Sequence, residues 1–136
     1  MIMTVVRKYH KGYNRVHEGN FLPDGLLGVN FCSKTIGIIG TGKIGLLTGR
    51  ILPKGFGATV IAYDPYPSKA VEEHGISYVD TLEEPLSVSY VISLHCPLLD
   101  STKYIINDNT LAQTKRGIII INTSRGGLID PYALIR

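Results

Sequence analysis

Short apolar runs along the chain alternate with stretches in which apolar side chains recur every three or four residues. The runs at 35–39, 59–63, 90–94 and 118–121 are almost continuously apolar, and a shorter run lies at 76–79. Such runs are typical of strands that are buried on both faces of a parallel sheet. The sequence shows no hairpin signal and no internal repeat, so the pattern predicts an α/β fold with a doubly wound parallel sheet.

The helices between these strands are marked by apolar spacing and by residues that stop a helix. Apolar spacing from Ile44 to Ile51 predicts a helix over 43–52, which Pro53 and Gly55 should end. Further short helices are expected at 68–74 and 107–113.

Residues that cap helices predict two more. Thr81 and Glu84 match the Thr-x-x-Glu capping box that opens a helix. Pro85 should keep this helix short or distorted, because proline lacks the backbone N–H that a helix uses. Asp130 is expected to cap a last helix with Pro131 at its first position.

The N-terminal segment carries apolar residues at helical spacing from Val5 to Val16, followed by a Gly- and Pro-rich loop at 19–28. Its basic side chains, with no acid before Glu18, also resemble the composition of a mitochondrial transit peptide. The basic residues fall largely on the opposite side from the apolar ones, which favours an amphipathic helix over a transit peptide.

Length and composition narrow the class of protein. A chain of 136 residues allows one domain, and 44% hydrophobic residues are enough for a globular core. No apolar run approaches the roughly 18–20 residues of a membrane span. The net charge of +3 comes without a block of like charges, so neither nucleic acid nor a membrane is an expected partner.

Cysteine usage gives no sign of a metal site. Cys32 and Cys96 stand far apart, with no Cys-x-x-Cys and no His at zinc-binding spacing. We therefore expect two buried, reduced thiols in a cytoplasmic protein, and no metal.

A glycine-rich segment follows the first predicted strand and opens the helix after it. It reads Gly40-Thr41-Gly42-Lys43-Ile44-Gly45 and matches the Gly-x-Gly-x-x-Gly pattern of dinucleotide-binding loops. Gly40 would allow the tight turn, Gly42 the close approach of a pyrophosphate, and Gly45 the packing of helix on strand. The helix N-terminus would offer N–H groups and a partial positive charge to the phosphates. The other glycine-rich phosphate loop does not fit, because no Ser or Thr follows Lys43.

Asp64 ends the next strand, about 20 residues after the glycine motif, which is the spacing expected of a ribose-binding acid. Its carboxylate can accept hydrogen bonds from the adenosine ribose, and its charge would repel a 2′-phosphate. Motif, context and acid together predict an NAD site. The alternative is a glycine-rich connection with no bound cofactor, in which Asp64 only caps the turn.

Two further strands end in polar residues, and ligands of parallel sheets lie beyond such carboxyl ends. One strand leads into His95-Cys96-Pro97 and another into Thr123-Ser124-Arg125. The guanidinium of Arg125 suits bidentate binding of a carboxylate. No carboxylate near His95 in sequence would orient it as a general acid or base, so a structural or cofactor-contacting role is favoured over catalysis.

These segments carry a family resemblance. Residues 33–45, 62–67, 91–98 and 121–130 closely resemble the D-isomer-specific 2-hydroxyacid dehydrogenases, and residues 13–21 look most like the D-lactate dehydrogenase branch. The resemblance implies a Rossmann-like NAD-binding domain at 21–136, preceded at 1–20 by the helix that joins the two domains and contributes to the dimer interface.

The resemblance also implies an activity and its residues. The family transfers hydride reversibly between NAD and a small 2-hydroxy or 2-keto acid, here of the D-lactate and pyruvate kind. Arg125 would hold the substrate carboxylate and Asp64 the adenosine ribose. The remaining cofactor contacts would come from the glycine loop and, at the nicotinamide end, from His95, Cys96, Pro97, Thr123 and Ser124.

The match is incomplete, which sets an expectation about activity. In the family a Glu–His pair supplies acid/base catalysis from positions C-terminal to the arginine, and this sequence ends at Arg136. We expect the substrate domain to be absent and the Rossmann-like sheet to be truncated at its C-terminal side, with the isoleucines of 118–121 exposed at its edge. Hydride transfer without a positioned proton donor loses a factor on the order of 10²–10⁴, so weak or no activity is expected of the chain alone.

Two other functions remain open. The chain could be a non-catalytic NAD-binding module, or an interaction protein that pairs with a full-length relative. Its N-terminal helix or the isoleucine-rich edge would then form the contact, and a homodimer is the other partner expected.

Overall fold

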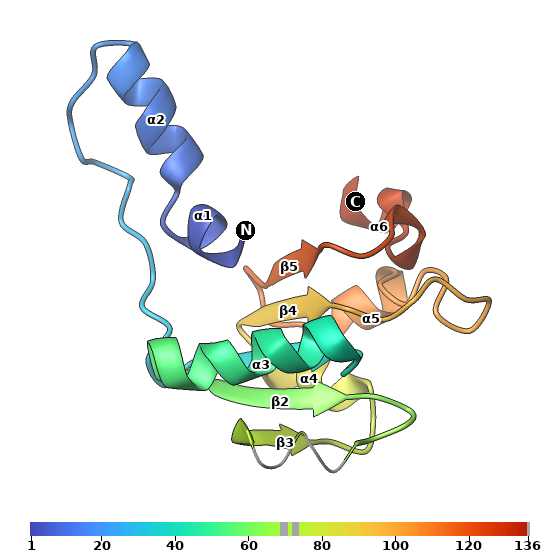
Figure 1. Ribbon diagram of the computed structural model, residues 1–136. Helices are drawn as coiled ribbons and strands as arrows, with labels where there is room; N and C mark the ends of the chain where they lie inside the picture. The colour runs from blue at the N-terminus through green and yellow to red at the C-terminus, as the bar shows by residue number, and fades with distance from the viewer. Residues whose placement is uncertain (69–70, 72–73, 136) are drawn as a thin grey trace. The chain divides into compact units, whose positions relative to one another are not determined.

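The computed structural model describes residues 1–68, 71 and 74–135, and the chain divides into two compact units, Met1–Asn30 and Phe31–Arg136 (Figure 1). The first unit holds helices α1 (Ile2–Val6) and α2 (Tyr9–His17) and the loop that follows them. The single N-terminal helix predicted from the apolar spacing is wrong in this respect. Lys8 adopts a left-handed conformation (φ 52°), which breaks the helical hydrogen bonding between α1 and α2.

The second unit is built on a parallel sheet of five strands in the order β3-β2-β1-β4-β5. The strands are β1 (Thr35–Ile39), β2 (Thr59–Tyr63), β3 (Ile76–Tyr78), β4 (Val91–Leu94) and β5 (Ile119–Asn122). Each lies within one residue of its predicted position, which confirms the α/β doubly wound fold. Strand β5 lies at one edge of the described sheet, but the expectation that the isoleucines of 118–121 are exposed there is wrong, because Ile121 is buried and the other three are half-buried.

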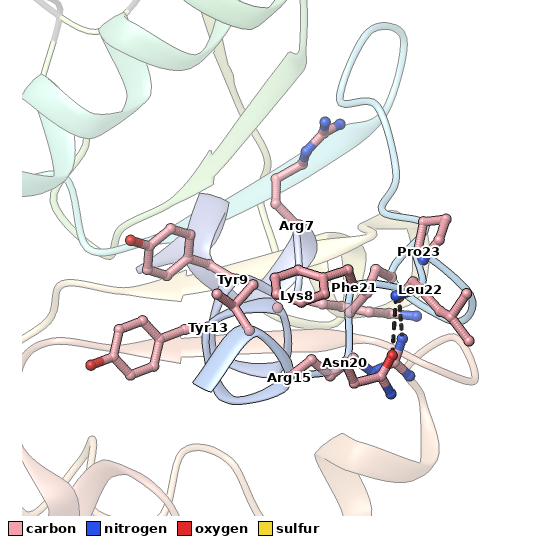
Figure 2. Close-up of a pocket in the computed structure, with 12 residues that line it drawn as sticks. Arg7, Lys8, Tyr9, Tyr13, Arg15, Asn20, Phe21, Leu22 and Pro23 are labelled. Atoms are coloured by element: carbon pink, nitrogen blue, oxygen red, sulfur yellow. Dashed lines mark hydrogen bonds between the residues drawn. The ribbon is translucent and has the colours of Figure 1, made fainter. Parts of the chain in front are cut away.

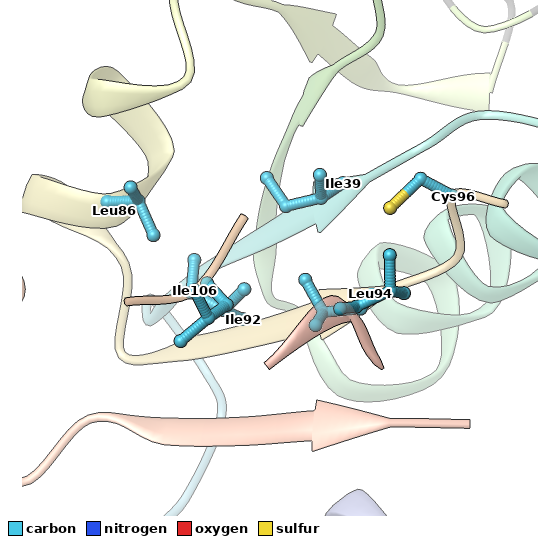
Figure 3. Close-up of a cluster of buried hydrophobic side chains, with 7 residues drawn as sticks. Ile39, Leu86, Ile92, Leu94, Cys96 and Ile106 are labelled. Carbon is cyan, nitrogen blue, oxygen red and sulfur yellow. The ribbon is translucent and has the colours of Figure 1, made fainter. Parts of the chain in front are cut away.

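Helices cover both faces of this sheet. Helix α3 (Lys43–Phe56) packs on β1 and β2, whereas α4 (Glu83–Val88) packs on the same strands from the other side and contacts α5 (Asp108–Ala112). The α4 face holds an apolar cluster, whose buried members include Ile39, Leu86 and Ile92 (Figure 3). Strand β1 thus has its side chains buried on both faces, as its unbroken apolar run requires.

Helix α3 is longer than predicted, because it continues through Pro53 and Gly55 to Phe56. Proline near the C-terminal end removes one backbone hydrogen bond and leaves the last turn intact. The helix ends instead at Gly57, whose left-handed conformation (φ 63°) lets its N–H donate to the carbonyl of Pro53.

The apolar spacing located α3 correctly, yet those side chains do not face the sheet. The buried residues of α3 are Gly45, Gly49 and Leu52, while Ile44, Leu47 and Ile51 are exposed. A β-carbon on Gly49 would lie 2.5 Å from Ile76 Cδ1, so a larger residue there would require the end of the Ile76 side chain to move.

The remaining helices test the capping predictions. The capping box of Thr81 and Glu84 is wrong: α4 begins at Glu83, and no side chain caps it. This start places Pro85 in the first turn, where its missing N–H would have no helical partner, and the helix is short as expected. Asn107 caps helix α5, which begins at Asp108, and α6 (Pro131–Ile135) begins at the predicted proline, with Asp130 Oδ1 accepting from Tyr132 N–H. The helix expected at 68–74 falls mostly outside the described residues.

Candidate functional site

The predicted site residues gather between β1 and β4, where the order of the strands in the sheet reverses. Strand β2 lies on one side of β1, and β4, which comes later in the chain, lies on the other. The carboxyl ends of β1 and β4 are joined directly, because His95 N–H donates to the Ile39 carbonyl at 2.7 Å. Such a reversal of strand order is where ligands of doubly wound sheets bind.

The glycine loop leaves β1 in a turn that only glycine tolerates. Gly40 has φ 92°, and a β-carbon on it would lie 2.6 Å from the backbone nitrogen of Cys96. A β-carbon on Gly45 would lie 2.0 Å from the Gly40 carbonyl oxygen. The first and third glycines of the motif are therefore required by packing between the loop, α3 and the end of β4.

Gly42, in contrast, faces open space, since nothing lies within 4 Å of a β-carbon built on it. It precedes the first residue of α3, and no side chain caps this helix end. The first N–H groups of a helix have no intrahelical partner, so an uncapped and open N-terminus suits an anion. The loop therefore fits a dinucleotide pyrophosphate, as its sequence predicts.

Asp64 lies beside this loop at the end of β2. Its Oδ2 accepts from the backbone N–H of Thr41 at 2.7 Å and from the Thr41 hydroxyl at 2.9 Å. Its Oδ1 accepts from Tyr66 N–H at 2.9 Å. The carboxylate is partly exposed and remains accessible to a ribose hydroxyl at the edge of the loop.

A cavity of about 410 Å³ lies beyond the carboxyl ends of β4 and β5. It is lined by His95, Cys96, Pro97, Leu98, Ser124 and Arg125. The Ser124 hydroxyl donates to the Cys96 carbonyl at 3.0 Å and holds the two segments together. All but one of these residues were predicted to bind cofactor or substrate, and Leu98 is the addition. Thr123 is exposed and is not among the lining residues.

Burial shifts the pKa values of both His95 and Cys96. Burial lowers the pKa of His95, whose Nε2 lies 2.9 Å from the hydroxyl of Ser93. Burial raises the pKa of the Cys96 thiol, and the negative charge of Asp64 acts in the same direction. The histidine therefore presents a neutral ring, and the cysteine a protonated thiol, near neutral pH. The expectation of two buried thiols is wrong for Cys32, which is exposed in the turn before β1.

Arg125 is exposed at the rim of the cavity. Its guanidinium donates to the Ser124 carbonyl at 3.3 Å, and its own carbonyl accepts from the side-chain amide of Asn122 at 2.8 Å. Asn122 also accepts from Ser124 N–H at 3.0 Å, which fixes the turn after β5. The backbone is thus held while most guanidinium donors remain available to an anion.

Besides Leu98, three polar contributors were not predicted from the sequence: Tyr78, Ser93 and Asn122. Each occupies a position at or near the carboxyl end of a strand, which is the signal that could have found them. Tyr78 OH lies 2.7 Å from the Thr41 hydroxyl and so belongs to the Asp64 cluster.

The first unit contains a separate cavity of about 530 Å³, lined mostly by apolar side chains of α2 and the loop after it (Figure 2). Two of the cations that line it, Lys8 and Arg15, are hydrogen-bonded within the unit. Arg15 donates to the carbonyls of Leu22 and Asp24, and Lys8 donates to the carbonyl of Gly25. These bonds explain how the Gly- and Pro-rich loop is held against α2.

The described part of the chain contains no cluster of three or more metal-ligating side chains. Nor does any helix among residues 1–68, 71 and 74–135 have the length and apolar character needed to cross a membrane.

Comparison with known proteins extends this picture. The family model for the NAD-binding domain of D-isomer-specific 2-hydroxyacid dehydrogenases matches residues 1–136. A D-lactate dehydrogenase of Curvularia clavata is 51% identical over all of this chain and 38% of its own length. The apo-structure of D-lactate dehydrogenase from Escherichia coli superposes with a TM-score of 0.94 at 49% identity, covering 98% of this chain and 42% of that one.

A third similar protein was solved with ligands bound. D-lactate dehydrogenase from Aquifex aeolicus, complexed with NAD and lactic acid, has a TM-score of 0.89 at 36% identity over 98% of this chain and 40% of that one. The chain thus spans about two fifths of the length of the relatives that it matches.

Proposed function

The chain belongs to the D-isomer-specific 2-hydroxyacid dehydrogenase family, as its NAD-binding domain, and we propose from this that it binds NAD across the reversal between β1 and β4. The observation that carries the proposal is the open, uncapped N-terminus of α3 at Gly42, with Asp64 beside it. The pyrophosphate would rest on the N–H groups of the loop and the adenosine ribose on Asp64.

The cavity beyond the carboxyl ends of β4 and β5 would hold the nicotinamide end. When bound there, NAD would accept a hydride at its nicotinamide ring and NADH would donate one. The lining segments His95–Pro97 and Ser124–Arg125, with Thr123 next to them, would orient that ring, and Arg125 would bind the substrate carboxylate through its planar fork. The substrate class is a small 2-hydroxy or 2-keto acid of the D-lactate and pyruvate kind.

NAD is proposed over NADP because of charge. The Asp64 carboxylate already accepts hydrogen bonds from Thr41 and Tyr66, and a 2′-phosphate beside it would add like charge at close range. Calorimetric titration with each cofactor tests this proposal. Saturable binding of NAD and weaker binding of NADP are expected. Absence of saturable NAD binding at millimolar concentration would contradict the proposed function.

Catalysis is the finer part of the proposal. The family's Glu–His acid/base pair follows the arginine in sequence, and residues 126–136 contain neither Glu nor His. We therefore propose that this 136-residue chain, assayed by itself, oxidises NADH with pyruvate weakly or not at all. Turnover at the rate of a complete dehydrogenase would contradict that statement and leave NAD binding untouched.

Self-association is a second candidate function, supported by the exposed apolar face of α3. Ile44, Leu47 and Ile51 are each at least half exposed, and apolar patches of this kind mark interaction sites. A homodimer, or a pair with a full-length relative, would bury them. Light scattering tests this proposal: a dimer that Leu47→Glu converts to monomer supports it, and a monomeric wild-type chain contradicts it.

A further inference from the structure

Four groups from three segments form a continuous chain of hydrogen bonds beside the glycine loop. Ser68 N–H donates to Tyr78 OH at 2.9 Å, and Tyr78 OH lies 2.7 Å from Thr41 Oγ1. Thr41 Oγ1 in turn donates to Asp64 Oδ2 at 2.9 Å. Tyr78 comes from β3, Thr41 from the loop after β1, and Asp64 and Ser68 from the loop after β2.

The donor and acceptor in every bond of this series follow from the Asp64 carboxylate at its end. An ionised carboxylate only accepts, so the single hydroxyl proton of Thr41 points to Asp64. The Thr41 oxygen must then accept from Tyr78, although geometry alone leaves that donor undecided. Tyr78 accepts from Ser68 N–H, which closes the series. Bonds that run in one direction polarise one another and strengthen the last contact with the charge.

The same bonds determine which carboxylate oxygen is left for a ligand. Oδ2 accepts twice from Thr41, through its N–H and its hydroxyl, whereas Oδ1 accepts once from Tyr66 N–H. A carboxylate oxygen has room for about two acceptor contacts, so capacity remains at Oδ1.

We propose that Tyr78 is a positioning residue for NAD: its hydroxyl holds Thr41 against Asp64 Oδ2, so that Oδ1 is presented to the adenosine ribose. The inference rests on the proposed function, because the ligand that would bind Asp64 is NAD. Tyr78 itself touches no ligand in this arrangement. Its contribution is to fix a charged side chain and the loop at 65–68 before binding, which reduces the ordering needed on association.

Removal of one phenol oxygen tests the proposal. Calorimetry with NAD should show about three- to tenfold weaker binding by Tyr78→Phe, the range expected for one lost hydrogen bond. Tyr132→Phe is the matched control, because it removes the same atom from a ring that is 73% exposed on α6. Its affinity for NAD should remain within about twofold of wild type.

A double-mutant cycle separates positioning from general loosening of the fold. On an Asp64→Ala background, Tyr78→Phe should change NAD affinity less than about twofold, because its effect is routed through that carboxylate. An equal loss on both backgrounds would overturn the inference, as would equal affinities of Tyr78→Phe and Tyr132→Phe. In either case NAD binding by the wild-type chain would still support the proposed function.

The middle of the hydrogen-bond chain offers a second test should Tyr78→Phe fold poorly. Thr41→Val keeps the shape of the side chain and removes its hydroxyl, whereas Thr41→Ser keeps the hydroxyl. Weaker NAD binding by Thr41→Val, restored in Thr41→Ser, is expected. Equal affinities of these two variants would overturn the inference, and a wild-type chain that fails to bind NAD would overturn both it and the proposed function.

Discussion

Gly45 lies directly against the carbonyl oxygen of Gly40, so that a β-carbon on Gly45 would come within 2.0 Å of that oxygen. The two glycines join the start of α3 to the end of β1, and the contact is backbone against backbone. No rotation of a side chain can relieve it. The position of the helix N-terminus at the proposed pyrophosphate site therefore depends on the absence of a side chain at residue 45.

Gly45→Ala is expected to destabilise the fold. The added methyl group must displace either α3 or the loop, and overpacking of this kind lowers the free energy of unfolding by about 1–3 kcal/mol. Urea denaturation followed by circular dichroism measures the change. A stability equal to that of the wild-type chain would show that the loop shifts without penalty.

Gly42→Ala should separate binding from stability. Its φ of −61° is one that alanine adopts without strain, and its β-carbon would meet nothing within 4 Å. The free energy of unfolding should therefore change by less than about 0.5 kcal/mol. NAD affinity should nevertheless fall at least tenfold in calorimetry, because the methyl group would occupy the space proposed for the pyrophosphate. Unchanged affinity would place the cofactor elsewhere.

The glycine loop and Asp64 were predictable from the sequence because each is tied to the end of a buried strand. A run such as 35–39 fixes the strand, and the residues after it must lie at the carboxyl edge of the sheet. Tyr78 also ends a strand, but this position alone does not predict its role, since a tyrosine in a strand is ordinary. Its role depends on Thr41, which lies far from it in sequence and reaches it only through the pairing of β1, β2 and β3.

The orientation of α3 shows another limit of pattern analysis. Apolar spacing normally marks the buried face of a helix, yet Ile44 and Leu47 are exposed and Gly45 and Gly49 are buried. Small residues on the contact side let the helix approach the sheet closely, and a β-carbon on Gly49 would lie 2.5 Å from the end of the Ile76 side chain. The periodicity of the sequence was therefore informative about the helix and misleading about its buried side.

His95 should make stability depend on pH near neutrality. Burial lowers its pKa below the ordinary value of 6.5, so as the pH falls the unfolded chain takes up a proton before the folded one does. The stabilising contribution is complete above pH 6.5 and is lost as the pH falls toward the lowered folded pKa.

Thermal unfolding from about pH 8 to pH 5 measures this contribution. The Tm of the wild-type chain should fall more steeply with decreasing pH than that of His95→Gln. The exposed His10 provides the control, and His10→Gln should follow the wild-type curve. Parallel curves for wild type and His95→Gln would show that the histidine titrates alike in both states.

The two thiols should differ in reactivity. Cys96 is 7% exposed, and burial together with the charge of Asp64 raises the pKa of its thiol. Cys32 is exposed. Because the thiolate is the reactive form, an aromatic disulfide reagent at neutral pH should modify Cys32 at least about tenfold faster than Cys96. Cys32→Ser should remove the fast phase and Cys96→Ser the slow one. A single rate for both thiols would contradict the burial of Cys96.

Two prolines in helices predict substitutions of opposite sign. Pro53 lies inside α3, where it removes a hydrogen bond to the carbonyl of Gly49. Pro85 lies in the first turn of α4 and is fully buried, and a β-carbon on Gly37 would come within 3.0 Å of its ring. The first proline weakens a helix, whereas the second fills space in the core.

Pro53→Ala is therefore expected to raise the free energy of unfolding by about 1–2 kcal/mol, the regained helical bond being partly offset by the greater freedom of the unfolded chain. Pro85→Ala should lower it by about 1–3 kcal/mol, because the lost ring leaves a cavity against β1 and no N–H bond is regained in the first turn. Urea denaturation of both variants beside the wild-type chain measures the two changes. Destabilisation by Pro53→Ala would mean that the proline ring contributes packing that outweighs the broken helical bond.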